Sequence, residues 1–191
     1  MAANLAKDRR PILIVTTGSA GREQALIDLF AATFTASEGA DEGGLIGSVV
    51  HDLLARTPAD DIRVFCAEAD GEILGAAIFT RLTYPDDPHR AVLLSPMAVA
   101  TDHQRRGIGC ALIAHALGAL RAEGVQIVMT YGDPAYYAQV GFHPITEDQA
   151  RAPLPLSMPQ GWIAQSLTGA PMPTLRGPST CVRALDREDL W

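Results

Sequence analysis

The sequence predicts a single domain of the α/β (α+β) class, in which strands and amphipathic helices build one core. Its 191 residues match the usual size of one domain. Asp70-Gly71 separates two β-rich runs, residues 62–68 and 73–82, and this dipeptide is a strong hairpin signal. Residues 107–122 then carry apolar side chains at helical spacing. A hairpin followed by a long amphipathic helix indicates a sheet with helices packed on it.

The chain before the hairpin predicts one strand and two helices. Residues 12–16 are a short β-rich run, and residues 22–34 have helical periodicity, with Ser19 as the expected N-cap. Residues 37–44 are polar and contain three glycines and three acids, so we expect a loop there. Two apolar ridges along residues 45–56 predict the second helix.

The chain after the hairpin predicts two more strands. Residues 91–99 are apolar and contain Pro96, which indicates a bulge or an edge. Residues 125–130, after the long helix, form a short β-branched strand. Asp133-Pro134 opens a short helix with Asp133 as its N-cap.

The last part of the chain is rich in proline, and only residues 161–167 and 181–185 are strand-like there. We therefore expect a core domain at residues 11–150. Residues 1–10 would be an N-terminal extension, and residues 151–191 a Pro-rich extension packed on the same domain.

Charge and composition exclude several classes of function. The net charge of −7 and the pI of about 5.1 disfavour nucleic acid and anionic membranes, which need a broad basic surface. No apolar run approaches the roughly 20 residues of a membrane span, and no signal peptide is visible. Cys66, Cys110 and Cys181 are far apart and show no metal or disulfide pattern, so we expect no metal and a cytoplasmic protein.

The most informative segment follows the strand at residues 91–99. Gly107 and Gly109 precede the long helix, whose first N–H groups lack helical partners and whose dipole favours an anion. Arg105 and Arg106 add positive charge. A Walker loop would need Gly-Lys-Ser/Thr, and a dinucleotide loop would need a third glycine where Leu112 stands, so neither pattern is met.

Two motifs carry a resemblance to a known family. Gln104-Arg-Arg-Gly-Ile-Gly109 resembles the Gln/Arg-x-x-Gly-x-Gly/Ala pyrophosphate loop of the GNAT superfamily of N-acetyltransferases. Tyr137-Ala-Gln-Val-Gly-Phe142 matches the Tyr-x-x-x-Gly-Phe motif after that superfamily's fifth strand. The Gly-Asp-Pro-x-Tyr-Tyr motif at residues 132–137 is similar to that of the YhbS-like predicted acetyltransferase branch. The order of elements agrees from residue 12 to about residue 142.

The resemblance implies a mixed, mostly antiparallel twisted sheet flanked by helices, with splayed fourth and fifth strands at residues 91–99 and 125–130. It implies an acetyl-CoA-dependent N-acetyltransferase, whose donor substrate is acetyl-CoA. The acetyl group would pass to a primary amine by direct attack in a ternary complex. The acceptor would be a small-molecule amine or a protein amino group, and the protein a monomer or homodimer.

The resemblance also assigns roles to residues. Tyr137 would be the general acid that protonates the leaving thiolate, and its alternative is a packing role beside Tyr136. The base stays open, with Glu68 as one possibility. The donor would contact the backbone or side chains of Met97, Val99, Gln104, Arg105, Arg106, Gly107, Gly109 and Cys110. The acidic residues expected near the acceptor amine are Glu38, Asp41 and Glu42.

Two other functions remain open at this point. Because no base is identified, the chain would also suit a catalytically idle acyl-CoA-binding sensor or regulatory module. A nucleotide-binding protein that uses the same glycines is a third possibility, against which the missing Walker lysine argues.

Overall fold

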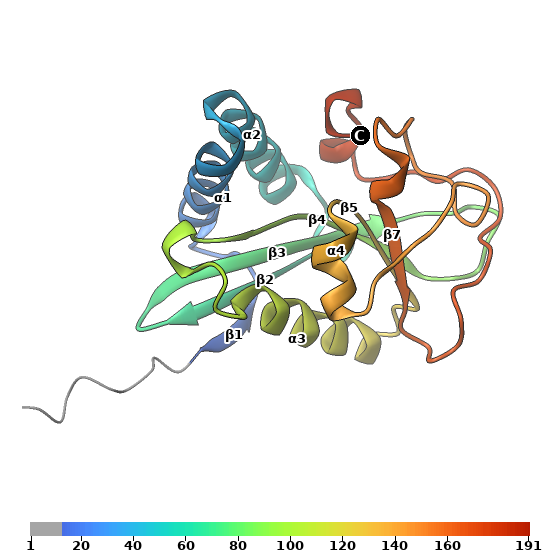
Figure 1. The fold of residues 1–191 in the computed structure, drawn as a ribbon, viewed down its shortest axis with the longest axis horizontal. Coiled ribbons are helices and arrows are strands. Elements are labelled where there is room, and N and C mark those ends of the chain that lie inside the picture. The colour runs from blue at the N-terminus through green and yellow to red at the C-terminus, as the bar shows by residue number, and fades with distance from the viewer. Residues whose placement is uncertain (1–12) are drawn as a thin grey trace, which may run out of the picture.

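The computed structural model describes residues 13–191 and contains one seven-stranded sheet in the order β1-β2-β3-β4-β5-β7-β6 (Figure 1). The predicted extension at residues 1–10 lies outside the described residues. The strands are β1 Ile14–Thr17, β2 Ile62–Ala69, β3 Glu72–Leu82, β4 Ala91–Val99, β5 Ile127–Tyr131, β6 His143–Pro144 and β7 Trp162–Ser166. The α-helices are α1 Glu23–Glu38, α2 Ala40–Arg56, α3 Ile108–Ala122 and α4 Pro134–Tyr137.

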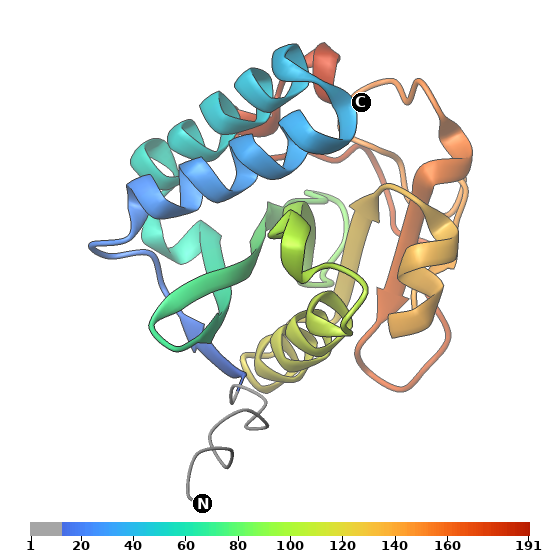
Figure 2. The same ribbon diagram turned by 60° about the vertical axis from the view of Figure 1, so that its left-hand side comes forward.

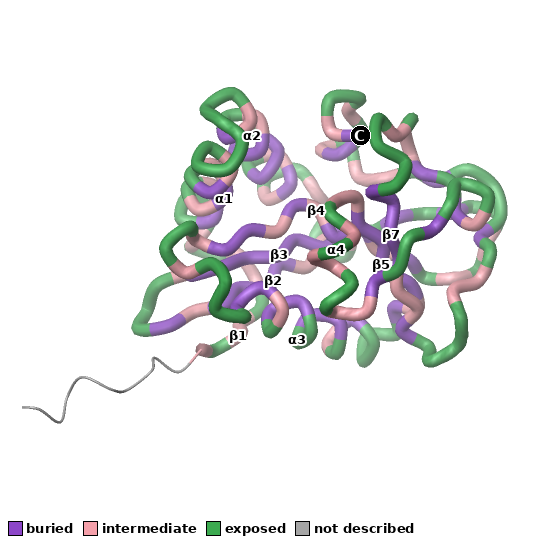
Figure 3. Tube along the Cα trace, viewed as in Figure 1, coloured by how far each residue is buried: buried purple, intermediate pink, exposed green. Residues whose placement is uncertain are grey.

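Helices cover both faces of the sheet. Figures 1 and 2 show α1 and α2 on one face and α3 on the other. Phe30 of α1 and Leu53 of α2 belong to the core on the first face, whereas Leu112 of α3 belongs to the core on the second. The strands in the middle of the sheet are accordingly buried along most of their length (Figure 3). This explains why the strands are apolar runs rather than alternating ones.

The sheet is mixed and mostly antiparallel, as the family resemblance implies. Among the strands of residues 13–191, only β4 and β5 pair in parallel, and α3 makes the crossover between them. Their pairing ends at Leu94 and Thr130, while β4 continues to Val99 against β3 alone. The fourth and fifth strands therefore separate. The register between β3 and β4 shifts where Pro96 lies, which is the predicted bulge.

The expected loop at residues 37–44 is wrong. α1 runs to Glu38 and α2 begins at Ala40, so Gly39 alone reverses the chain, with φ +103°. Gly43 lies inside α2, where a Cβ atom would overlap the Thr35 side chain of α1. That glycine therefore permits close helix packing. Two of the three acids of this segment, Asp41 and Glu42, lie in the first turn of α2, where they interact favourably with the helix dipole.

Two smaller expectations are also corrected. The N-cap of α1 is Arg22, and Ser19 contributes only its backbone carbonyl, which accepts the Arg22 N–H. Residues 181–185 do not form a strand but lead into the 3-10 turn η5 Arg183–Leu185, which packs against α2.

The chain after residue 150 contributes to the sheet and to its core. β7 lies between β5 and β6, and its Trp162 is fully buried, with the indole N–H donating to the carbonyl of Ala150 at 2.8 Å. Leu185 and Trp191 belong to the core on the α1/α2 face. A segment that looks irregular in the sequence therefore completes the sheet.

Candidate active site

The N-terminus of α3 exposes unpaired backbone donors. Gly107 is the N-cap, in the left-handed region with φ +79°, and no side chain caps the helix. The first helical N–H with a backbone acceptor is that of Ala111, which donates to the Gly107 carbonyl at 3.0 Å. The N–H groups of residues 108–110 therefore point out of the helix, at the positive end of its dipole. This arrangement suits an anionic ligand such as a phosphate.

These N–H donors border a groove of about 630 Å³. It runs between α3, the end of β4, the second half of α1 and the segment that follows β5. Its volume lies within the roughly 300–1,000 Å³ of typical ligand sites. The groove occupies the side of β4 that β5 leaves free, because no pairing between the two strands continues past Leu94 in the described chain.

Most of the predicted donor-site residues line this groove. They are Met97, Val99, Gln104, Arg105, Gly107, Gly109 and Cys110, joined by Glu38 from the end of α1. Arg106 is not among the lining residues, and its guanidinium donates to the Asp102 carbonyl at 2.7 Å. Asp41 and Glu42 lie in the first turn of α2 and do not line the groove either. The structure thus gathers the glycine loop, β4 and one of the three acids.

Gln104 joins the glycine loop to β4. Its side-chain amide donates to the carbonyl of Val99 at 3.0 Å. Arg105, the next residue, adopts a left-handed backbone conformation with φ +58°. The hydrogen bond therefore fixes the turn between β4 and α3 at the point where the backbone changes direction.

Tyr137 lies where β4 and β5 separate. Thr130, the last β5 residue paired with β4, donates its hydroxyl to the Leu94 carbonyl at 2.8 Å. The ring of Tyr137 packs against Gly132, the residue after β5, because a Cβ atom there would lie 3.0 Å from Tyr137 Cε2. Burial raises the pKa of Tyr137, and the Thr130 side chain only partly opposes that effect. Tyr137 is thus a protonated phenol at neutral pH, next to the separation of the two strands.

Tyr136 is the residue that sequence reasoning underrated. The sequence indicates a structural residue, but Tyr136 lines the groove and faces Gly109, whereas Tyr137 does not line it. The two rings pack edge to face at 5.1 Å between centroids. Adjacent side chains of an α-helix such as α4 lie about 100° apart around its axis, so the two rings point in different directions. The tyrosine pair was a visible signal, but the sequence did not reveal which ring faces the groove.

Glu68, the other carboxylate that the sequence offers as a base, lies near the end of β2. Its carboxylate is ion-paired with Arg22 and accepts a hydrogen bond from Thr16. Because Arg22 is the N-cap of α1, this ion pair supports the start of the helix.

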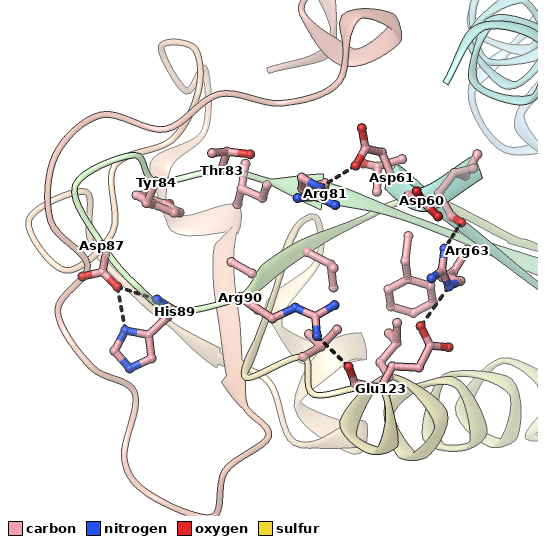
Figure 4. A pocket seen from close by; sticks show the side chains of 18 residues that line it. Asp60, Asp61, Arg63, Arg81, Thr83, Tyr84, Asp87, His89, Arg90 and Glu123 are labelled. Atoms are coloured by element: carbon pink, nitrogen blue, oxygen red, sulfur yellow. Dashed lines mark hydrogen bonds and ion pairs between the residues drawn. The ribbon is translucent and has the colours of Figure 1, made fainter. Parts of the chain in front are cut away.

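A second hollow, of about 150 Å³, lies near the far end of α3 (Figure 4). Several of its charged side chains are paired with one another. Arg81 pairs with Asp61, and the Arg63 Nε lies 2.9 Å from Glu123. His89 Nδ1 lies 2.6 Å from the Asp87 carboxylate. Because these charges neutralise one another, the hollow is a weaker candidate for binding a charged ligand than the uncapped N-terminus of α3.

The described residues contain neither a candidate metal site nor a candidate membrane-spanning helix. Residues 13–191 hold no group of three or more His, Cys, Asp or Glu that would suit a metal ion. None of the helices in that range has both the length and the apolarity that a membrane crossing requires.

Comparisons with known proteins give one consistent result. A family model described as an acetyltransferase (GNAT) domain matches residues 60–144. The uncharacterized N-acetyltransferase YjhQ of Escherichia coli K12 is 34% identical over 145 residues, covering 73% of this chain and 77% of that protein. The uncharacterized N-acetyltransferase YhbS of the same strain is 27% identical over 94 residues, covering 49% of this chain and 56% of that protein.

Solved structures agree on the fold. The crystal structure of Escherichia coli YhbS in complex with CoA superposes with a TM-score of 0.80 at 20% identity, covering 95% of this chain and 96% of that one. A GNAT family acetyltransferase from Brucella melitensis, in complex with acetyl-CoA, gives a TM-score of 0.71 at 22% identity, covering 93% and 100%.

Proposed function

The chain belongs to the GNAT family of acetyltransferases, and on that premise we propose that it transfers an acetyl group from acetyl-CoA to a primary amine in a ternary complex. One observation supports this most strongly. The uncapped N-terminus of α3 and the free side of β4 face the same groove, beside the point where β4 and β5 separate. Residues 11–150 are the proposed acyltransferase domain, with residues 151–191 packed on it.

The groove suits the two chemical parts of the donor. The N–H groups that follow Gly107 bind the pyrophosphate, with Arg105 adding charge from the same loop. The backbone of Met97 and Val99 pairs with the amide groups of the pantetheine arm, as an added strand would. Gly109 matters because a Cβ atom there would lie 3.2 Å from Met97 Cε and would narrow the groove.

The reaction requires proton transfers at the nitrogen and at the sulfur. The amine nitrogen attacks the thioester carbonyl, so that a C–N bond forms and the C–S bond breaks, and the nitrogen then releases one proton to solvent. The departing thiolate takes the proton of Tyr137, which solvent then restores. The ammonium form of the acceptor first loses a proton to water or to a carboxylate. Glu38, at the end of α1 and in the lining of the groove, attracts the cation, and Asp41 and Glu42 add negative charge from the first turn of α2.

Calorimetric titration with acetyl-CoA tests the donor, with free CoA, ATP and NAD as comparators. We expect acetyl-CoA to bind in the micromolar range and ATP and NAD to bind more weakly. An amine panel, assayed for release of free CoA thiol, then tests transfer. Binding without transfer to any amine would favour an acyl-CoA sensor. Failure of acetyl-CoA to bind would reject the acyltransferase proposal itself.

A further inference from the structure

The Tyr136 side chain carries a free hydrogen-bond donor into the groove. Tyr136 lines the groove and is half-buried, and its hydroxyl forms no hydrogen bond within residues 13–191. The hydroxyl of Tyr131, by contrast, lies 3.0 Å from Ser157 Oγ and accepts the Met158 N–H at 2.6 Å. Tyrosine hydroxyls that are shielded from bulk water usually find a partner, so a free one in a ligand groove is available to the ligand.

This hydroxyl lies against the first turn of α3. A Cβ atom built on Gly109 would overlap the Tyr136 oxygen. The same Cβ would lie 3.2 Å from Met97 Cε and 3.4 Å from Val99 Cγ2, both at the end of β4. Because the Cα–Cβ bonds of a helix tilt toward its N-terminus, the oxygen lies on the side toward which the free N–H groups of residues 108–110 also point.

The hydroxyl thus lies between the two parts of the proposed donor site. The N–H groups that follow Gly107 bind the pyrophosphate, and the backbone of Met97 and Val99 pairs with the pantetheine arm. The group that joins these two parts of acetyl-CoA is the phosphate nearest the arm. A hydrogen bond from a hydroxyl to a charged phosphate oxygen is roughly twice as strong as one between neutral groups.

The phenol of Tyr136 is held both in its protonated form and in its direction. Burial raises the pKa of Tyr136, and the neighbouring Cys110 and Tyr137 act in the same sense. The group therefore keeps its proton at neutral pH and meets an anion as a donor. Edge-to-face packing on the Tyr137 ring and contact with Gly109 hold the side chain between α4 and α3.

Resting on the proposed function, we infer that Tyr136 is a donor-binding residue, whose hydroxyl donates a hydrogen bond to the phosphate nearest the pantetheine arm of acetyl-CoA. The two adjacent tyrosines then have separate roles. Tyr136 sets the affinity for the donor, because its hydroxyl lies at the phosphate end of the groove. Tyr137 sets the rate, because it protonates the leaving thiolate.

Tyr136→Phe tests this role, because it removes the hydroxyl and keeps the ring. In calorimetry acetyl-CoA should bind this variant about tenfold or more weakly than wild type. The affinity for 4′-phosphopantetheine, which carries the phosphate in question, should fall by a similar factor. Pantetheine, which lacks a phosphate, should not distinguish the two proteins. In transfer assays KM for acetyl-CoA should rise while kcat stays within about twofold of wild type, whereas Tyr137→Phe lowers kcat.

Tyr131→Phe is the matched control, because it removes a phenol hydroxyl that bonds outside the groove, and it should bind acetyl-CoA as wild type does. Removing the Tyr136 hydroxyl costs the fold no hydrogen bond, so that variant should unfold at the wild-type temperature. Failure of wild type to bind acetyl-CoA would reject the proposed function itself. If wild type binds, unchanged affinity in Tyr136→Phe overturns the inference alone. An equal loss of affinity for pantetheine and 4′-phosphopantetheine also overturns it.

Discussion

Gly109 lies against the hydroxyl of Tyr136, so that a Cβ atom at this position would overlap the phenol oxygen. The two residues come from α3 and α4, on either side of the groove. The close approach places the glycine loop beside the tyrosine motif. In the sequence these are two separate motifs.

Gly109→Ala is therefore expected to weaken acetyl-CoA binding by about tenfold to a hundredfold, because the added methyl displaces Tyr136 and narrows the groove. Calorimetry measures the effect. Gly118→Ala is the matched control, since a Cβ on that glycine of the same helix meets nothing within 4 Å. The Gly118→Ala variant should bind acetyl-CoA with unchanged affinity, and its free energy of unfolding should rise by up to about 1 kcal/mol. Equal affinities for the two variants would remove Gly109 from the donor site.

Tyr137→Phe is expected to lower kcat by about 10²–10⁴-fold, the usual contribution of a general acid, while acetyl-CoA binding persists. Because burial raises the pKa of Tyr137 from the usual value of 10.0, the phenol stays protonated through neutral pH. In wild type, loss of the acid should therefore lower kcat only above about pH 10. Tyr136→Phe, which keeps the ring in the groove, is the comparison. Stopped assays over pH would contradict the assignment if Tyr137→Phe kept full turnover.

Cys110 is expected to be the thiol that alkylates first, and acetyl-CoA should protect it. Cys110 lines the groove, whereas burial raises the pKa of Cys66 and raises that of Cys181 to about 11. Iodoacetamide labelling followed by peptide mass spectrometry measures the rate at each thiol. Saturating acetyl-CoA should slow labelling of Cys110 and leave Cys181 unaffected, and Cys110→Ser should lose the fast phase. A Cys110 rate that acetyl-CoA does not change would place the donor elsewhere.

Asp87→Asn is expected to destabilise the fold by about 1–3 kcal/mol at neutral pH. The carboxylate is 4% exposed and accepts the backbone N–H groups of His89 at 3.0 Å and Arg176 at 3.1 Å. Burial acts to raise the pKa of Asp87, but these hydrogen bonds and the His89 ring hold it below the usual 3.8. This contact also ties residues 151–191 to the connection between β3 and β4.

The pH dependence of that effect has a defined sign. A folded-state pKa below the unfolded one contributes stability above pH 3.8, which is lost as the pH falls through the folded value. Urea unfolding at several pH values should therefore show a constant difference between wild type and Asp87→Asn near neutral pH, and a smaller one in acid. Asp148→Asn, at an exposed carboxylate, is the control. A difference that grows in acid would refute the account.

The sequence by itself determined the elements whose signals are local. The Asp70-Gly71 hairpin, the strand at Ala91–Val99, the bulge near Pro96 and the Asp133 cap all follow from turn chemistry and periodicity, which act over a few residues. The anion-binding character of the glycine loop is local in the same sense, because it depends on backbone donors at one helix end.

Only the tertiary structure decided the rest. The sequence predicts a loop at Gly43, but in the structure this glycine lets α2 pack closely against α1. The sequence likewise predicts a structural role for Tyr136, but α4 directs its side chain toward Gly109 and the groove. Trp191 stacks on Tyr131 from 60 residues further along the chain, and no short pattern encodes that ring packing. These assignments depend on contacts between distant segments, and the free energy of such contacts exists only once the chain has folded.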